Sequence, residues 1–405
     1  MADPRWSYAE AHALTLAHIQ PLPAEEVELM ALVGRVLAQD LVARVDSPSA
    51  DVSFKDGYAV ISADIAQATP ESPVRLRLLD GRAAAGGGLW QGEITPGTAI
   101  RILSGGEIPR GAQAVVAEEF THEDGDSVLV TADAQPGRNV LPRGCDIAAG
   151  TRLFPAATRL RPTQIGMMAA AGLDRAPVVR RPRVALIATG DEVIAPGKPL
   201  QPGKLYASNL VTLAAWCGRY DLAATTDVVP DHAPDIRAAL AAAVATHDAV
   251  ITSGGAWKGE RDLVAGLLDD LGWTMHYHRV RIGPGKAVGF GLLAAKPVFC
   301  LPGGPPSNHI AFLQLALPGL LRLAGVEPPG LPTALVELAA DLRGQEDWTQ
   351  FEHGRLEAVG DGLRFHPLKP RSRLQMMAEA DAVVMIPEGV AHIPAGEVVR
   401  AQLLR

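Results

Sequence analysis

Three glycine-rich segments carry polar side chains that could bind or transform a ligand, and each follows a short apolar run. They span residues 189–192, 253–262 and 301–307. Glycine lets backbone N–H groups approach an anion closely, and a helix that begins beyond such a loop adds a favourable dipole. One loop of this kind is also common as a plain turn after a strand. Three of them together indicate a phosphate-bearing ligand.

Carboxylates in and near these segments could hold a divalent cation. Asp191, Glu192 and Asp262 lie within them, and Asp231 follows the apolar run at 223–229. Magnesium prefers hard oxygen ligands, takes only one or two protein carboxylates, and completes its shell with water and phosphate. Asp191, Glu192 and Asp231 are equally compatible with helix N-caps or solvated loop charges. A magnesium site and a structural role are therefore both open.

One lysine could bind an anion, and the absence of several motifs argues against some classes of enzyme and metal site. Lys286 lies in a Gly/Pro segment at 281–286, where its ammonium group could bind an oxyanion or phosphate; an ordinary exposed lysine is the alternative. The sequence has no His-Glu-x-x-His motif, no Gly-x-Ser-x-Gly elbow and no P-loop, which argues against the corresponding hydrolase classes. Cys145, Cys217 and Cys300 form no Cys-x-x-Cys pair, which disfavours a disulfide framework or a thiolate zinc site.

The elements around these loops predict a parallel, doubly wound α/β domain. Apolar runs at 184–188, 223–229, 249–251 and 297–300 have the character of buried strands, and the patterns at 210–217 and 233–246 are helical. In such a sheet, ligands bind outside the carboxyl ends of the strands. The polar loops should therefore meet at one edge.

The flanking regions predict other modules. Short β-rich runs such as 74–79 and 114–116 lie between glycine turns, and strand-like runs recur at 333–338 and 382–386. Residues 6–44 and 163–171 have helical patterns, and Glu25 and Glu26 are expected in the first turn of a helix. The fold class is thus α/β plus β modules.

Charge and hydropathy exclude other roles. The chain has 405 residues, with 37 Lys and Arg against 45 Asp and Glu, so its net charge is -8. This argues against nucleic acid or an anionic membrane as the main partner. The N-terminus lacks a basic region followed by an apolar run, and the apolar stretch at 310–325 is interrupted and too short to span a bilayer. We expect a soluble cytoplasmic protein.

Further short motifs lie outside the α/β region, and with the loops described above they form a series along the chain. Together the segments resemble, in type and order, those of the molybdopterin molybdenumtransferase family, which includes MoeA and the gephyrin E domain. The matching segments are Asp56-Gly57-Tyr58-Ala59, Ser104-Gly105 with Pro109, Gly111-Ala112, Glu118-Glu119, Gly144-Cys145-Asp146-Ile147 with Gly150, Thr189-Gly190-Asp191-Glu192, Asp231, Ser253-Gly254-Gly255, Gly259 with Asp262, Pro284-Gly285-Lys286 and Leu301-Pro302-Gly303 with Pro305. The resemblance runs over nearly the whole chain.

The resemblance implies an elongated homodimer with four domains per chain. They are a discontinuous helical linker and dimerisation domain at 1–49 and 148–178, a β-rich domain at 50–147, an α/β molybdopterin-binding domain at 179–327, and a C-terminal β-barrel-like domain at 328–405. The partner subunit's β-rich domain would contribute to the active site. A molybdopterin adenylyltransferase or molybdoenzymes would be possible further partners.

The resemblance also implies an activity and residue roles. The enzyme would insert molybdate into adenylylated molybdopterin and release AMP, with Mg²⁺. By matching position, Asp56, Ser104 and Asp146 would serve the catalytic, metal-oxyanion end. The implied substrate-binding residues are Thr189, Glu192, Asp231, Ser253, Gly254, Gly255, Asp262, Lys286, Pro302 and Pro305. The implied metal ligands are Asp56, Asp146, Glu192 and Asp262.

Several positions depart from the family pattern, and four of them bear most directly on activity. Lys55 precedes the Asp-Gly-Tyr motif, Trp257 follows the Ser-Gly-Gly motif, and Gly283 and Gly304 replace a usual lysine and asparagine. These departures are compatible with a second interpretation: a non-catalytic or specialised paralogue that binds pterin or molybdenum cofactor and delivers it to a partner enzyme. A nucleotidyltransferase of the related adenylating type is a third interpretation, based on the α/β domain alone.

Overall fold

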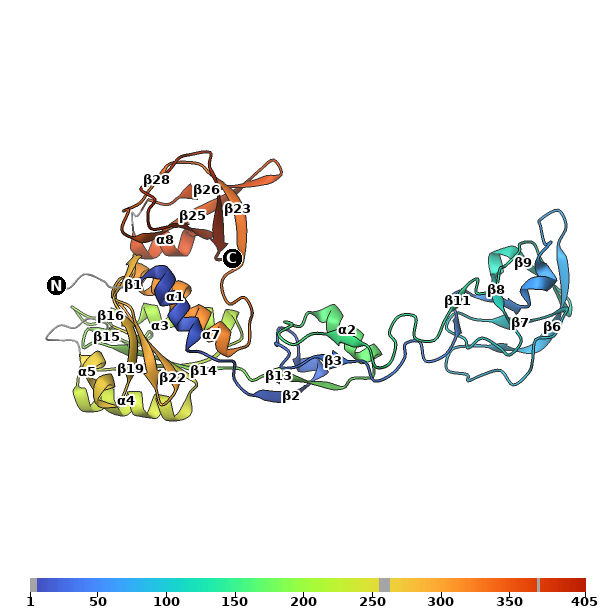
Figure 1. Ribbon diagram of the computed structural model, residues 1–405, viewed down its shortest axis with the longest axis horizontal. Helices are drawn as coiled ribbons and strands as arrows, with labels where there is room; N and C mark the ends of the chain where they lie inside the picture. Colours follow the sequence, from blue (N-terminus) through green and yellow to red (C-terminus); the bar gives the residue numbers. More distant parts are fainter. Residues whose placement is uncertain (1–5, 255–262, 370–371) are drawn as a thin grey trace. The chain divides into compact units, whose positions relative to one another are not determined.

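The computed structural model describes residues 6–254, 263–369 and 372–405 (Figure 1). Contacts divide the chain into two units. We call Met1–Glu25 with Val178–Arg405 the α/β unit, and Glu26–Pro177 the 26–177 unit. Residues 1–25 thus join the α/β unit, whereas the sequence grouped them with 26–49.

A six-stranded sheet organises the α/β unit. Its order is β17 (Ala223–Val229), β14 (Arg183–Thr189), β18 (Ala249–Ser253), β22 (Lys296–Leu301), β21 (Gly289–Leu293) and β19 (Thr274–His278). The first four strands pair in parallel, as predicted. The sheet is not wholly parallel, because β21 and β19 add an antiparallel edge. The turn at Ala294 and Ala295, both with positive φ, joins β21 to β22 as a hairpin.

Helices cover both faces of this sheet. They are α1 (Tyr8–Ala17), α3 (Ser208–Arg219), α4 (Ala233–Thr246), α5 (Leu263–Asp270), α6 (Pro305–Ala311), the π-helix η4 (Phe312–Ala316) and α7 (Leu317–Leu323). Successive residues of β14 enter different cores: Leu186 packs in the core that holds α3, α6 and α7, and Ile187 in the core that holds α4 and α5. Such double burial explains the uninterrupted apolar run of this strand.

The N-terminal helix α1 is tied to the α/β unit. Ser7 and Glu10 form a capping box, in which the Ser7 hydroxyl accepts from the Glu10 N–H at 3.2 Å and the Glu10 carboxylate accepts from the Ser7 N–H at 2.8 Å. Further along, the Thr15 hydroxyl lies 2.8 Å from the buried Tyr277 hydroxyl of β19. These contacts explain why α1 belongs to this unit rather than to residues 26–49.

The helix expected at Glu25 and Glu26 is wrong. Both residues lie in strand β2 (Ala24–Glu28), and a 3₁₀ turn, η1 (Leu29–Ala31), follows. Along β2, exposed residues alternate with half-buried ones, including Val27. That period of two is typical of a strand, and the two acidic residues obscured it in the sequence.

The 26–177 unit contains a β-rich sheet, as predicted. Its order is β8 (Ala114–Ala117), β5 (Gly57–Val60), β7 (Thr98–Ile102), β6 (Val74–Ala83), β10 (Ser127–Val130) and β9 (Thr121–Asp124). A Cβ on Gly57 would lie 1.9 Å from the Val116 carbonyl oxygen, so only glycine permits this pairing. The unit's other elements are β3 (Leu41–Val42), β4 (Val52–Ser53), η2 (Ser62–Ile65), η3 (Glu118–Phe120), β11 (Val140–Leu141), β12 (Arg152–Phe154), α2 (Pro162–Ala170) and most of β13 (Arg175–Val179).

The C-terminal part of the α/β unit is a β module. Strands β25 (Thr349–Val359), β26 (Gly362–Pro367), β23 (Thr333–Leu338), β29 (Val398–Leu403) and β27 (Ala382–Ile386) pair in a closed ring, since β27 returns to β25. The ring resembles a small barrel. Strands β20 (Val280–Gly283) and β1 (Trp6–Ser7) extend it from β25. The remaining elements are β15 (Val193–Ile194), β16 (Leu205–Tyr206), β24 (Leu342–Arg343), α8 (Arg373–Glu379) and β28 (His392–Ile393).

No helix among the described residues is both long and apolar enough to cross a membrane.

Candidate functional site

The carboxyl ends of the parallel strands lie at one edge of the sheet. Thr189 pairs with Val229, and Ser253 pairs with both Ala188 and Leu301. The residues that follow these strand ends are therefore neighbours. They include Thr189, Asp231, Ser253, Gly254 and Pro302, which are sequence-predicted site residues, whereas Gly255 and Asp262 lie outside the described residues.

Gly254 is the point where three strand ends come closest. Its N–H donates to the Leu301 carbonyl at 3.0 Å, and its φ is +98°. A Cβ here would lie 2.7 Å from the Thr189 carbonyl oxygen, closer than any side chain could approach. Glycine is required at this position because both the backbone conformation and the space exclude other residues.

Three carboxylates follow the ends of two neighbouring strands, β14 and β17. The Asp231 N–H donates to Asp191 Oδ1 at 3.1 Å, and Glu192 folds back over Gly190. Partial burial, together with the negative charges of Asp191 and Glu192, raises the pKa of Asp231 above its usual range. The Lys204 ammonium group donates to the Asp191 carbonyl.

The structure disfavours the capping alternative for these carboxylates. Helix α4 has His232 as its N-cap, without a side-chain capping bond, and a strand rather than a helix follows Glu192. A divalent cation would instead reduce the repulsion among these three carboxylates. Magnesium needs only one or two protein carboxylates as direct ligands. The group therefore fits Mg²⁺ electrostatically. Within the described ranges, no group of three or more His, Cys, Asp or Glu is arranged so that it could hold a metal ion, so protein groups alone do not form a metal site here.

Two asparagines that the sequence did not single out join the loops of this edge. Asn308 Nδ2 lies 3.0 Å from both Ser253 Oγ and the Pro302 carbonyl oxygen. Asn209 Nδ2 lies 2.9 Å from the Gly303 carbonyl oxygen and 3.3 Å from Ser253 Oγ. Both residues occupy helical patterns, so no local sequence signal distinguished them from ordinary helix residues.

The loop that carries Lys286 lies against helix α6, which begins at Pro305. A Cβ on Gly285 would lie 3.2 Å from the Ser307 carbonyl oxygen, so the loop that carries Lys286 packs on the start of α6. Lys286 is exposed, and Pro305 is the first residue of α6 after Gly304. Among the described residues, no atom outside the glycine and its chain neighbours lies within 4 Å of a Cβ built on Gly304.

The 26–177 unit brings together two of its three predicted residues. The Ser104 N–H donates to Asp56 Oδ1 at 2.5 Å, and both residues are exposed. Lys55 and Phe54 are exposed beside them, with the Lys55 ammonium 6.0 Å from the Phe54 ring centroid. The carboxylate of Asp56 thus fixes the glycine turn at 104–106 while it remains accessible to solvent.

Asp146 lies on another loop of the same unit. Its N–H donates to the Ser47 carbonyl at 3.1 Å, and its side chain is exposed. Asp46 holds this loop by accepting from Arg143 Nε at 2.6 Å and from the Ala149 N–H at 2.7 Å. Among the residues the structure describes, no hydrogen bond joins Asp146 to Asp56 or Ser104.

Comparison with known proteins establishes the family. Family models match residues 6–172 as the MoeA N-terminal region (domain I and II), 185–322 as a probable molybdopterin binding domain, and 336–404 as the MoeA C-terminal region (domain IV). A Mycobacterium tuberculosis protein named molybdopterin molybdenumtransferase 2 is 34% identical over 91% of this chain and 92% of its own length. This chain belongs to the MoeA family.

A second sequence relative and a solved structure are also similar to this chain over most of its length. A Nostoc protein named molybdopterin molybdenumtransferase is 31% identical over 92% of this chain and 87% of its own length. The crystal structure of a molybdopterin biosynthesis MoeA protein from Pyrococcus horikoshii superposes with a TM-score of 0.85 and 31% identity, over 98% of this chain and 99% of that one. The MoeA-like combination of an α/β domain with β-rich and C-terminal β domains is thus confirmed.

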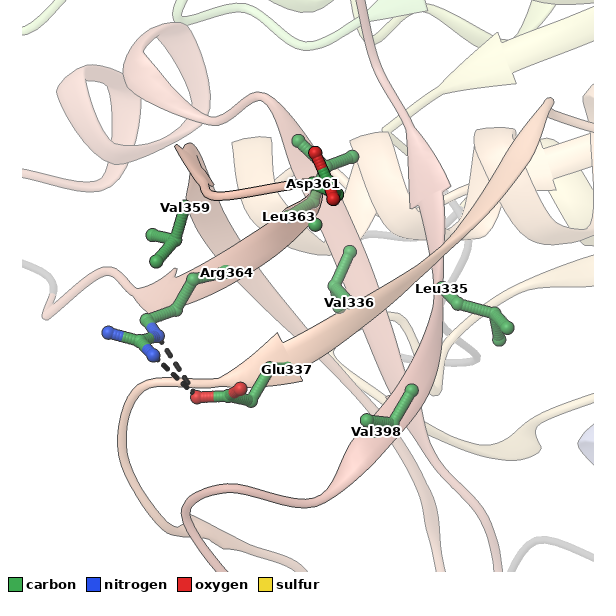
Figure 2. A pocket seen from close by; sticks show the side chains of 9 residues that line it. Leu335, Val336, Glu337, Val359, Asp361, Leu363, Arg364 and Val398 are labelled. Carbon is green, nitrogen blue, oxygen red and sulfur yellow. Dashed lines mark hydrogen bonds and ion pairs between the residues drawn. The ribbon is translucent and has the colours of Figure 1, made fainter.

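A cavity in the MoeA C-terminal region is separate from the sheet edge. It has a volume of about 370 Å³ and lies among strands β23, β26 and β29. Figure 2 shows Leu335, Val336 and Val398 on one side, and the ion pair between Arg364 and Glu337. None of the predicted site residues lines it, so the cavity does not mark the candidate site.

Proposed function

We propose that this chain is a molybdopterin molybdenumtransferase that inserts molybdate into adenylylated molybdopterin and releases AMP. Curated relatives that cover most of the chain carry that enzyme name. The observation that carries the proposal is the sheet edge, where the glycine-only approach at Gly254 and the carboxylates of Asp191, Glu192 and Asp231 follow the ends of neighbouring strands. The glycine approach suits a phosphate-bearing ligand, and the carboxylates suit a divalent cation.

The residues of this edge have distinct proposed roles. Thr189, Ser253 and Gly254 would contact the pterin or its phosphate, and Pro302 and Pro305 would line the same site. The exposed ammonium group of Lys286 would offset phosphate charge. Gly255 belongs to the proposed binding set through its sequence match.

The acidic group would bind Mg²⁺ as the activity's cofactor. Glu192 and Asp231 would be its ligands, with Asp191 holding the Asp231 backbone in place through the 3.1 Å bond. When bound, the cation offsets the negative charge that develops on the departing AMP. Asp262 remains a proposed ligand from the sequence.

In the proposed homodimer, the β-rich domain of the partner subunit would contribute to the active site, and Asp56, Ser104 and Asp146 would be residues of the catalytic, metal-oxyanion end. Asp56 and Asp146 would be metal ligands, since both carboxylates are exposed. The proposal further includes a cytoplasmic homodimer and a molybdopterin adenylyltransferase or molybdoenzymes as partners. It keeps the four domains drawn from the sequence, except that residues 6–25 join the α/β domain.

Complementation separates an active insertase from a cofactor-delivery paralogue. A bacterial strain that lacks its own insertase should regain molybdoenzyme activity when it expresses this chain. The Asp56→Asn variant, expressed at the same level, should not restore it. Failure of the unaltered chain, with the protein present and folded, would favour the delivery role.

A further inference from the structure

The hydroxyl group of Ser253 is held by two amide groups from different helices. Asn209 of α3 and Asn308 of α6 each place Nδ2 within hydrogen-bond distance of Ser253 Oγ, at 3.3 Å and 3.0 Å. Ser253 is only 5% exposed, and Asn308 only 2%. Because these groups are buried, each donor and acceptor among them needs a partner.

The direction of the two hydrogen bonds follows from the neighbouring carbonyl groups. Asn308 Nδ2 also contacts the Pro302 carbonyl oxygen at 3.0 Å, and Asn209 Nδ2 contacts the Gly303 carbonyl oxygen at 2.9 Å. A carbonyl oxygen can only accept, so in each asparagine the atom that faces it must be the amide nitrogen. Each NH₂ group therefore gives one hydrogen to a carbonyl and its second hydrogen to Ser253 Oγ.

The consequence for Ser253 is that its own hydrogen must point elsewhere. A hydroxyl oxygen has two acceptor positions and one donor hydrogen. The two amides occupy both acceptor positions, and within the described ranges no protein group accepts the Ser253 hydrogen. The hydroxyl is thereby fixed as a donor at the sheet edge, next to the close approach at Gly254.

We propose that Asn209 and Asn308 are positioning residues that force the Ser253 hydroxyl to donate a hydrogen bond to an acceptor oxygen of the bound adenylylated molybdopterin. This inference rests on the proposed function, because that function supplies the anionic ligand. The same two amide groups also connect the end of β18, at Ser253, to the loop after β22, at Pro302 and Gly303. A donor that has no acceptor among the described protein groups can donate to a ligand oxygen, and most strongly to an anionic one.

The test is calorimetric binding of adenylylated molybdopterin to the full chain. Removing the hydroxyl in Ser253→Ala should weaken binding by about tenfold or more, as expected for a hydrogen bond to a charged group. Asn308→Asp should weaken it similarly at neutral pH. The carboxylate has no N–H to give, and it accepts the Ser253 hydrogen instead, which turns the donor away from the ligand.

The pH profile separates positioning from simple loop support. Burial raises the pKa of a carboxyl group, so the carboxylate introduced by Asn308→Asp should take up a proton as the pH falls below 7. The protonated acid has one hydrogen to donate, which can replace one of the two that Asn308 gives, so the affinity of Asn308→Asp relative to the unaltered chain should recover in part between pH 7 and pH 5. Gln314→Glu is the matched control, since it buries a new acid in the same helical segment away from Ser253. Its relative affinity should not depend on pH.

The outcomes distinguish this inference from the proposed function. Failure of the unaltered chain to bind adenylylated molybdopterin would overturn the proposed function. If the unaltered chain binds, but Ser253→Ala binds equally well or the Asn308→Asp loss does not recover at low pH, the positioning role is wrong. Should Asn308→Asp fail to fold, Asn209→Asp provides the same test, since Asn209 makes the same pair of bonds.

Discussion

Gly254 illustrates how a single backbone position can determine a ligand site. Its φ of +98° disfavours other residues. A Cβ at this position would lie 2.7 Å from a backbone atom, the Thr189 carbonyl oxygen. A flexible side chain could move aside, whereas a strand carbonyl cannot without disturbing β14. The sequence already indicated a close approach here, because glycines follow an apolar run.

We predict that Gly254→Ala weakens binding of adenylylated molybdopterin by at least about tenfold and lowers the free energy of unfolding by about 1–3 kcal/mol. Calorimetry and chemical denaturation measure the two effects. Gly266→Ala on α5 is the control, because open space surrounds its Cβ position. It should leave binding unchanged and keep or slightly raise stability. Wild-type binding by Gly254→Ala would contradict the close-approach argument.

Asp56 offers a second prediction at the residue scale. Asp56→Asn retains an oxygen that can accept the Ser104 N–H, so the turn should persist while the negative charge disappears. Asp56→Asn should abolish molybdenum insertion with little change in melting temperature. Asp146→Ala should also abolish insertion, and its melting temperature should change little because the Asp146 side chain is exposed. Insertion assays and thermal melts test both variants. Full insertion activity in both variants would show that the carboxylates of Asp56 and Asp146 are not needed for catalysis.

At the scale of elements, a buried histidine pair joins α6 to β25. His309 and His353 stack with ring centroids 5.7 Å apart, and Trp216 Nε1 donates to His309 Nε2 at 3.0 Å. Burial, reinforced by the neighbouring His353, lowers the pKa of His309 to about 3, and burial lowers that of His353 to about 4. Both imidazoles are therefore neutral in the folded protein near pH 7.

This pair predicts that stability falls on acidification. In the unfolded chain both histidines have a pKa of about 6.5, so below that pH the unfolded state binds more protons and is favoured. Each histidine should cost about 1.4 kcal/mol per pH unit below 6.5 until its folded pKa is reached. Urea denaturation between pH 8 and pH 5 measures the slope, and replacing both with glutamine should reduce it. His366→Gln is the exposed control. A slope unchanged by the double replacement would refute this assignment.

Elements with a clear apolar period were predictable from the sequence. The patterns at 223–229, 233–246, 333–338 and 382–386 correspond to β17, α4, β23 and β27. Strand β25 was missed because residues 349–359 carry charged and polar residues amid few apolar ones. The antiparallel edge formed by β21 and β19 was not part of the predicted parallel sheet, because a strand's direction depends on its partners, which no local pattern encodes.

The candidate site was predictable to a similar degree. The sheet edge follows from the rule that parallel strands end together, so Thr189, Ser253 and Asp231 could be grouped in advance. Asn209 and Asn308 could not, since their partners are backbone carbonyls and a hydroxyl brought near by tertiary folding. The relation between Asp146 and the Asp56–Ser104 pair was equally beyond sequence patterns.

At the scale of the whole molecule, membership of the MoeA family accounts for the sequence of modules. Family models cover residues 6–172, 185–322 and 336–404, and they include both groups of candidate residues. The net charge of -8 is compatible with an anionic substrate, because glycine approaches, a lysine and a cation would neutralise that substrate locally. The central claim concerns the reaction itself.

The most direct test is AMP release by the purified chain. It is incubated with adenylylated molybdopterin and Mg²⁺, with and without molybdate, and AMP is quantified by chromatography while the pterin product is tested for its ability to activate an apo-molybdoenzyme. The account predicts molybdate-dependent release of one AMP per pterin, together with active cofactor. Intact adenylylated molybdopterin at saturating molybdate, with the protein folded and the substrate bound, would contradict it.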